Sequence, residues 1–161
     1  MMLNYYKIDK VDKQIINFLS NDARMPYTEI AKIIGVSVGT VHGRVKKLED
    51  AGIIKGATLT IDYVRLGYRF IAYVGIFLRE TYRSDDVIKE LYKIPEVTIA
   101  NVTSGQFSIF SKIRCRDTQH AKKVIDKILG IKGIRRTESM IALEESFNSK
   151  QRLISSIFDQ M

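Results

Sequence analysis

Apolar residues between positions 28 and 52 recur at the spacing of two short helices. The first apolar stripe consists of Ile30, Ala31, Ile33 and Ile34, and the second of Val38, Val41, Val45 and Leu48. Intervals of three and four residues place such side chains on one buried face of a helix. Gly35-Val36-Ser37 supplies a tight turn between the two stripes. The pattern predicts a helix-turn-helix.

Three small or polar residues indicate where these helices begin and end. Thr28 is the predicted N-cap of the first helix and Ser37 that of the second, because a hydroxyl accepts a hydrogen bond from a free backbone N–H. Gly52 follows the last periodic residue, where a glycine commonly ends a helix. We expect the second helix to span the residues between Ser37 and Gly52.

Another helix is predicted before this motif, over residues 8–19. Asp9 is its expected N-cap, and Asp12 lies in the first turn, where a carboxylate interacts favourably with the helix dipole. Pro26 lies in the turn that follows and prevents the helix from continuing. Three short helices make a unit of about fifty residues, which is marginally stable alone. We therefore expect the rest of the chain or a partner to stabilise this head.

The second half of the chain alternates strand and helix patterns. Residues 53–61 are rich in β-branched side chains and predict a strand that leaves the head, followed by a hinge at 62–67. Four strands and two helices are then predicted, at 68–79, 84–92 (helix, with Ser84 as its cap), 97–104, 107–115, 117–129 (helix) and 134–145. The order βαββαβ is that of a ferredoxin-like domain.

The predicted fold class is α+β, in four parts. These are a winged-type helix-turn-helix head (1–53), a connecting strand and hinge (54–67), a ferredoxin-like βαββαβ domain for oligomerisation and effector binding (68–146) and a C-terminal amphipathic helix or tail (147–161). The tail has an apolar stripe of helical spacing. Its sequence leaves open whether it docks on its own chain or on a neighbour.

The strand at 68–79 is apolar on both faces. One face carries Phe70, Ala72, Val74, Ile76 and Leu78, and the other Ile71, Tyr73, Gly75 and Phe77. Helices cover one face of a ferredoxin-like sheet, so the second apolar face needs another cover, for which the sheet of a second subunit is the simplest candidate. We expect a homodimer that can assemble further, to a tetramer or octamer.

The formal net charge is +8 and the sequence pI is about 9.6, which favours an anionic partner. Cys115 is the only cysteine, so no intramolecular disulfide is possible, as is usual in a reducing cytoplasm. The N-terminus lacks the apolar segment of a secretory signal, and the longest apolar run, 70–78, is too short to span a bilayer. We expect a cytoplasmic protein without a membrane partner.

The polar face of the second helix of the motif is suited to double-stranded DNA. It carries small polar residues and cations with no acid before Glu49. The expected base contacts are Thr40, His42, Arg44 and the backbone near Val38 and Gly39. Ser37, Lys46 and Lys47 are the expected phosphate contacts, and Gly43 completes the DNA-contacting set.

The chain shows no motif for catalysis, a metal or a cofactor. His42 and His120 are its only histidines and lie in different predicted domains, and no triad, phosphate-binding loop or dinucleotide fingerprint occurs. An RNA-recognition module is a further alternative, because aromatic residues mark the strand at 107–115. Phe107 and Phe110 are expected on opposite faces of that strand, which argues against a stacking platform for bases.

In the order of its parts the sequence resembles the Lrp/AsnC (feast/famine) family of transcription regulators. The resemblance covers residues 8–146, and its most specific segments are Ile8-Asp9…Asp12…Ile15-Ile16, Ile30-Ala31…Gly35-Val36-Ser37 and Arg44-Val45-Lys46-Lys47-Leu48-Glu49…Gly52-Ile53-Ile54. The resemblance implies dimers that bind DNA and assemble further, often to octamers. It also implies that an amino acid or a related metabolite binds between C-terminal domains.

The family's effector region contains a Gly-x-(Tyr/Phe)-Asp motif, which corresponds here to Ser104-Gly105-Gln106-Phe107-Ser108. Ser108 replaces the acid, and a neutral hydroxyl is a weaker partner for a ligand ammonium group. We hypothesise that this chain binds a different small molecule or none. Two alternatives to sequence-specific regulation are an architectural protein that wraps DNA with little sequence preference and a regulatory subunit of a metabolic enzyme.

Overall fold

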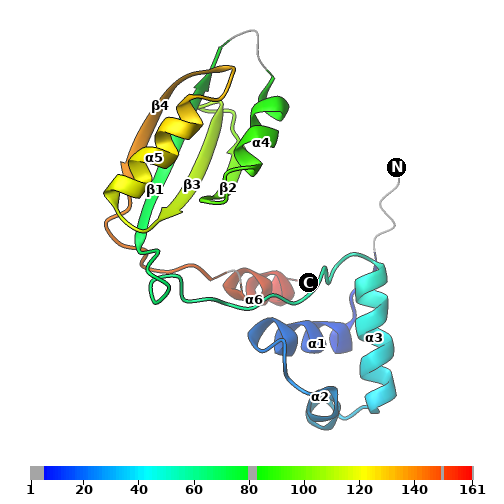
Figure 1. Ribbon diagram of the computed structural model, residues 1–161. Coiled ribbons are helices and arrows are strands. Elements are labelled where there is room, and N and C mark those ends of the chain that lie inside the picture. Colours follow the sequence, from blue (N-terminus) through cyan, green and yellow to red (C-terminus); the bar gives the residue numbers. More distant parts are fainter. Residues whose placement is uncertain (1–5, 80–82, 150, 161) are drawn as a thin grey trace. The chain divides into compact units, whose positions relative to one another are not determined.

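The computed structural model describes residues 6–79, 83–149 and 151–160 (Figure 1). The chain forms two compact units. Residues 1–60 and 147–161 make up the first, which contains the helix-turn-helix, and residues 61–146 make up the second, which contains the sheet. The C-terminal segment therefore belongs to the same unit as the N-terminal head.

The head consists of α1 (Lys10–Asn21), α2 (Tyr27–Ile34) and α3 (Val38–Asp50). Its core contains the predicted apolar residues Ile15, Ile30, Ala31, Val41 and Val45. Two predicted core residues are exposed instead: Val38 is 37% exposed and Ile33 is 54% exposed. Val38 is exposed because it is the first residue of α3, and the buried residues of this helix begin one turn later, at Val41.

The predicted caps of α1 and α3 are confirmed. Asp9 caps α1 in a capping box, with its Oδ1 accepting from the Asp12 N–H at 2.9 Å. Ser37 caps α3 by accepting a hydrogen bond from the Thr40 N–H at 3.0 Å. The prediction for α2 was wrong, since the N-cap position is Pro26, which has no side-chain cap hydrogen bond, and Thr28 lies inside the helix.

The segment after α3 does not form the predicted strand at 53–61. The N–H groups of Ile53 and Ile54 turn back to the Leu48 carbonyl, which closes the end of α3, with Gly52 at a φ of 70°. A strand requires a hydrogen-bonded neighbour, and the described part of the chain supplies none to this segment. Leu59 is 73% exposed here.

The C-terminal segment forms the predicted amphipathic helix, α6 (Gln151–Gln160), and lies against α1. Lys13 of α1 donates to the Phe158 carbonyl at 3.1 Å, and its ammonium lies over the Phe158 ring. Within this chain, α6 is thus a fourth helix of the head.

The second unit contains β1 (Phe70–Leu78), α4 (Ser84–Tyr92), β2 (Val97–Val102), β3 (Ile109–Cys115), α5 (Thr118–Leu129) and β4 (Ile134–Ile141). The sheet is antiparallel with the strand order β2-β3-β1-β4, and α4 and α5 pack on one face of it (Figure 1). The predicted α+β class with a βαββαβ domain is confirmed. Arg83, not Ser84, occupies the N-cap position of α4.

The other face of the sheet carries an aromatic cluster. Tyr73 stacks on Phe110 at a ring-centroid distance of 5.7 Å, and Phe107 stacks on Phe110 at 5.8 Å. The prediction that Phe107 and Phe110 lie on opposite faces was therefore wrong. Strand alternation applies only from Ile109, where β3 begins, and Phe107 belongs to the preceding loop.

Candidate nucleic-acid interface and effector site

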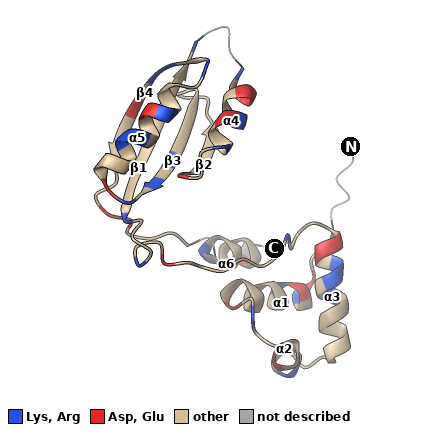
Figure 2. Cartoon of the chain, in the orientation of Figure 1, with Lys and Arg blue, Asp and Glu red and all other residues tan. Residues whose placement is uncertain are grey.

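The face of α3 that points away from the core is composed of small residues and lysines. Gly39, Thr40, Gly43, Lys46 and Lys47 are exposed. The N-terminal half of α3 is uncharged, and its basic residues lie further along the helix (Figure 2). A neutral, narrow helix start followed by cations fits the entry of a recognition helix into the major groove, with its N-terminal residues at the bases.

Packing among the described residues does not require glycine at positions 39 and 43 of α3. A Cβ added at Gly43 would meet no atom within 4 Å, and one at Gly39 would meet only Ser37 Oγ, at 3.8 Å. Neither glycine has a positive φ. Glycine inside a helix costs roughly 0.5–1 kcal/mol relative to alanine.

Ser37, Thr40 and His42 lie at the start and edge of this face. The Ser37 and Thr40 hydroxyls lie 2.9 Å apart and share a hydrogen bond. The exposed His42 ring makes an edge contact with Tyr27 of α2, with the ring centroids 4.6 Å apart. The imidazole is thereby held at the side of α3 that faces α2.

Arg44 differs from the other cations of α3 because its charge is paired within the head. Its Nη1 lies 2.5 Å from Asp9 Oδ2 and 3.3 Å from Asp12 Oδ1. Hydrogen bonding to Asp9 raises the pKa of the guanidinium above its ordinary value. The pKa of Asp9 is lowered, chiefly because the Asp12 N–H donates to its carboxylate. The local sequence pattern did not predict this pairing, and its one signal was the acid pair Asp9 and Asp12 at the start of α1.

The predicted effector residues form the connection between β2 and β3. The Ser108 N–H donates to the Ile76 carbonyl at 2.9 Å, and the Ser108 hydroxyl accepts from the Leu78 N–H at 3.3 Å. The Thr103 N–H donates to the Ser108 carbonyl. The loop is therefore tied to the end of β1, and the Ser108 hydroxyl has a structural partner.

An open depression lies beside this loop. Its lining includes Ser104, Gly105, Phe107 and Ser108 of the predicted set and also Leu78, Arg79, Ser84, Val102 and Thr103. Gln106 is exposed and does not line it. Arg79 and Ser84 come from the end of β1 and the start of α4, and no motif in the sequence pointed to them. The lining residues that the structure describes supply an exposed guanidinium and several hydroxyls but no carboxylate.

Neither a metal-binding cluster nor a reactive thiol occurs among the described residues. No group of three or more His, Cys, Asp or Glu side chains among them is placed to hold a metal ion. Cys115 is buried, and burial raises the pKa of its thiol to about 11, so it stays protonated at neutral pH. No helix within the described ranges is long and apolar enough to cross a membrane.

A helix-turn-helix head joined to a ferredoxin-like domain with a ligand-sized depression defines a class of transcription regulators. The family model for a winged helix-turn-helix DNA-binding domain matches residues 8–55, and that for the Lrp/AsnC ligand binding domain matches residues 71–151. The chain belongs to the Lrp/AsnC family, as the sequence predicted. It is a transcription regulator with a DNA-binding and a ligand-binding part.

Individual relatives are similar over nearly their whole length. Regulatory protein AsnC of Haemophilus influenzae is 40% identical over 140 residues, which are 86% of this chain and 93% of that protein. The structure of Escherichia coli AsnC matches with a TM-score of 0.85 and 38% identity over 89% of this chain and 97% of that one. The feast or famine regulatory protein Rv3291c of Mycobacterium tuberculosis, solved in complex with L-methionine, matches with a TM-score of 0.83 and 26% identity, with the same coverage of both chains.

Proposed function

We propose that α3 enters the major groove of double-stranded DNA and that the protein regulates transcription from specific sites in the cytoplasm. The observation that carries this proposal is the pair of exposed glycines, Gly39 and Gly43, whose small size packing within the head does not require, on the same helix as the exposed Lys46 and Lys47. Thr40, His42 and the backbone at Val38 and Gly39 face base edges in this arrangement. Ser37, Lys46 and Lys47 contact phosphate, because hydroxyls and ammonium groups are ordinary phosphate donors.

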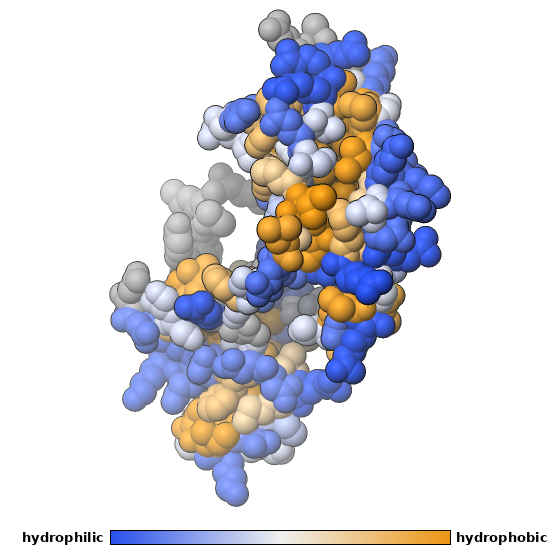
Figure 3. All heavy atoms as spheres, turned by 90° about the vertical axis from the view of Figure 1, so that its left-hand side faces the viewer, coloured by the Kyte–Doolittle hydropathy of each residue, from blue (hydrophilic) through white to orange (hydrophobic). Residues whose placement is uncertain are grey.

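Specific recognition by so small a head requires pairing of two heads. Figure 3 shows exposed apolar side chains on the unit 61–146. On the sheet face that carries the aromatic cluster, Ile99 and Met140 are exposed; Ile99 pairs with Lys112, and Met140 pairs with Tyr73. We propose that this sheet packs on a second subunit to form a homodimer, which assembles further to a tetramer or octamer. A dimer presents two α3 helices to successive major grooves.

The depression beside residues 103–108 is the proposed effector site. Rv3291c is solved with L-methionine, and the present chain has Ser108 where the family has an acid. Because the Ser108 hydroxyl is occupied by the Leu78 N–H, residue 108 supplies no charge for a ligand ammonium group. We propose a small-molecule effector other than a standard amino acid, or none. The chain itself performs no catalysis, in keeping with its regulatory relatives.

The test is selection of sites from a random duplex library, followed by affinity measurement on the selected site and on scrambled duplexes at several salt concentrations. We expect a selected site bound at least about a thousandfold more tightly than scrambled DNA, as specific regulators do. Equal affinity for all duplexes with a steep salt dependence would instead identify an architectural DNA-wrapping protein. Calorimetric titration with the twenty amino acids tests the effector proposal, and tight binding of any of them at this depression contradicts it.

A further inference from the structure

Arg44 belongs to the helix proposed to contact DNA, yet its guanidinium is bound by two carboxylates of α1. Nη1 contacts Asp9 Oδ2 at 2.5 Å and the two oxygens of Asp12 at 3.3 and 3.4 Å. The Asp12 side chain is wholly buried, and the Tyr6 hydroxyl donates to its Oδ2 at 3.2 Å. Arg44 itself is 32% exposed. These groups form one network between the start of α1 and the middle of α3.

The charged groups of this network are paired with one another inside the protein, without DNA. A buried carboxylate is strongly destabilising without a cation, and removing one partner of such a pair leaves an uncompensated charge. One guanidinium and two carboxylates carry a net charge of −1, so Arg44 presents no free positive charge to an approaching phosphate. Lys46 and Lys47, by contrast, form no ion pair within the described part of the chain.

The network also constrains the rotation of α3 about its axis, in addition to its buried apolar stripe. Apolar side chains such as Ile15, Val41 and Val45 hold α1 and α3 together, but such contacts are non-directional. Hydrogen bonds of a planar guanidinium to carboxylates are directional. They resist rotation of α3 about its axis, and that rotation decides whether Gly39 and Gly43 point toward a groove.

We infer that Arg44 is a positioning residue, which orients α3 through Asp9 and Asp12, and that base discrimination is left to the exposed residues of α3. This inference rests on the proposed binding of DNA by α3. It replaces the expectation from the sequence that Arg44 contacts a base edge.

The experiment compares the full-length wild type with Arg44→Ala, Arg44→Lys, Asp9→Asn and the double variant Arg44→Ala/Asp9→Asn. Affinities are measured for the duplex selected by the wild type and for each of its single-base-pair variants. Lys47→Ala serves as a phosphate-contact control, in which the salt slope is expected to fall by about 1. Circular dichroism establishes the temperature below which each variant is folded, and binding is measured there. Arg44→Lys is a second variant at this position, which keeps the positive charge but lacks the planar, directional hydrogen-bond donors of the guanidinium.

We expect Arg44→Ala and Asp9→Asn each to weaken binding about tenfold, equivalent to ~1.4 kcal/mol, to every duplex alike, with base preferences and salt slope unchanged. The result for Asp9→Asn is decisive, because removing a negative charge beside DNA otherwise strengthens phosphate attraction. The double variant should bind no worse than Arg44→Ala, since both changes break one network.

Loss of discrimination at a single base pair in Arg44→Ala, with Asp9→Asn binding as tightly as the wild type or more tightly, overturns the inference. Unchanged affinity in Arg44→Ala overturns it as well. Failure of the proposed function has a different signature, in which the wild type itself selects no site.

Discussion

Phe107, in the loop between β2 and β3, lies directly against the backbone of Gly75 in β1. A Cβ at position 75 would lie 2.4 Å from Phe107 Cδ1 and Cε1, which is closer than real side-chain contacts. The ring also packs edge-on against Phe77, with centroids 5.2 Å apart. The position of the Phe107 ring therefore requires glycine at position 75. Through this contact the loop that lines the proposed effector site is packed against the central strand β1.

Replacing Gly75 by Ala should displace the Phe107 ring from Phe77 and Phe110. Overpacking of this kind costs about 1–3 kcal/mol, and we expect a loss of that size in urea unfolding. Gly105→Ala, in the loop that carries Phe107, is the control, because a Cβ there meets nothing within 4 Å. Equal stability of Gly75→Ala and Gly105→Ala would show that the ring moves aside at no cost.

Gly43→Ala should change stability and DNA binding in opposite directions. Alanine stabilises a helix interior by roughly 0.5–1 kcal/mol relative to glycine, and the site has room for the added methyl group. The melting temperature should therefore rise, while affinity for the selected duplex should fall because the methyl group prevents close approach to the groove. Tighter or unchanged binding would remove Gly43 from the interface.

Apolar periodicity was sufficient to predict the helices of the head and the βαββαβ order, because both follow from local patterns of side-chain burial. It was insufficient where the structure depends on distant partners. Arg44 stands among cations in the sequence, and its partners Asp9 and Asp12 lie more than thirty residues earlier. The segment 53–61 has the composition of a strand but no strand to pair with in this chain.

Local rules also failed at element boundaries. Thr28 and Ser84 are good capping residues, but both lie inside their helices. The helix α2 begins at Tyr27, and α4 begins at Ser84 itself. Phe107 was assigned to a strand that begins only at Ile109. Its ring direction is determined by the space above Gly75, which is a tertiary feature that strand alternation does not predict.

Ser108→Asp should restore the acid of the family motif and with it binding of an ordinary amino acid. A carboxylate in the depression attracts a ligand ammonium group. Isothermal titration of the variant with the twenty amino acids, beside the wild type, checks this outcome. Ser108→Ala is the control, which loses the acceptor for the Leu78 N–H and about 1 kcal/mol of stability without gaining a ligand. Absence of binding by Ser108→Asp would show that further residues of the depression exclude amino acids.

The stability of the sheet unit should fall in acid because of Glu145. Its carboxylate pairs with Lys112 and with Arg114, and hydrogen bonding from Lys112 is the main cause of a pKa below the ordinary value. A lowered folded-state pKa means that the contribution is fully present above the unfolded pKa of about 4.3 and is lost as the pH falls through the folded-state pKa.

Glu145→Gln should be less stable than the wild type at neutral pH and should lose less stability between pH 5 and about pH 2, the range in which ordinary carboxylates become protonated. Thermal unfolding across this range provides the measurement. Glu144→Gln is the neighbouring control. Parallel curves for Glu145→Gln and the wild type would show that this carboxylate does not contribute to the acid response.

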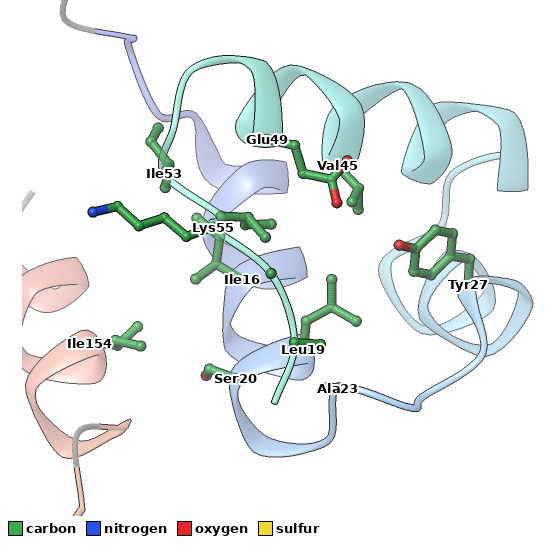
Figure 4. A pocket seen from close by; sticks show the side chains of 13 residues that line it. Ile16, Leu19, Ser20, Ala23, Tyr27, Val45, Glu49, Ile53, Lys55 and Ile154 are labelled. Atoms are coloured by element: carbon green, nitrogen blue, oxygen red, sulfur yellow. The ribbon is translucent and has the colours of Figure 1, made fainter. Parts of the chain in front are cut away.

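Truncation after Ser149, which removes α6, should destabilise the DNA-binding head. Ile154 points from α6 toward Ile16 and Ser20 of α1 across an apolar depression that Ile53 and Lys55 also border (Figure 4). A three-helix head is marginally stable, and α6 covers part of α1. The truncated chain should therefore melt at a lower temperature. Ile154→Ser should reproduce part of the loss, whereas Leu153→Ser, at a side chain that is 64% exposed, should not. Equal melting of Ile154→Ser and Leu153→Ser would show that α6 does not stabilise the head through this face.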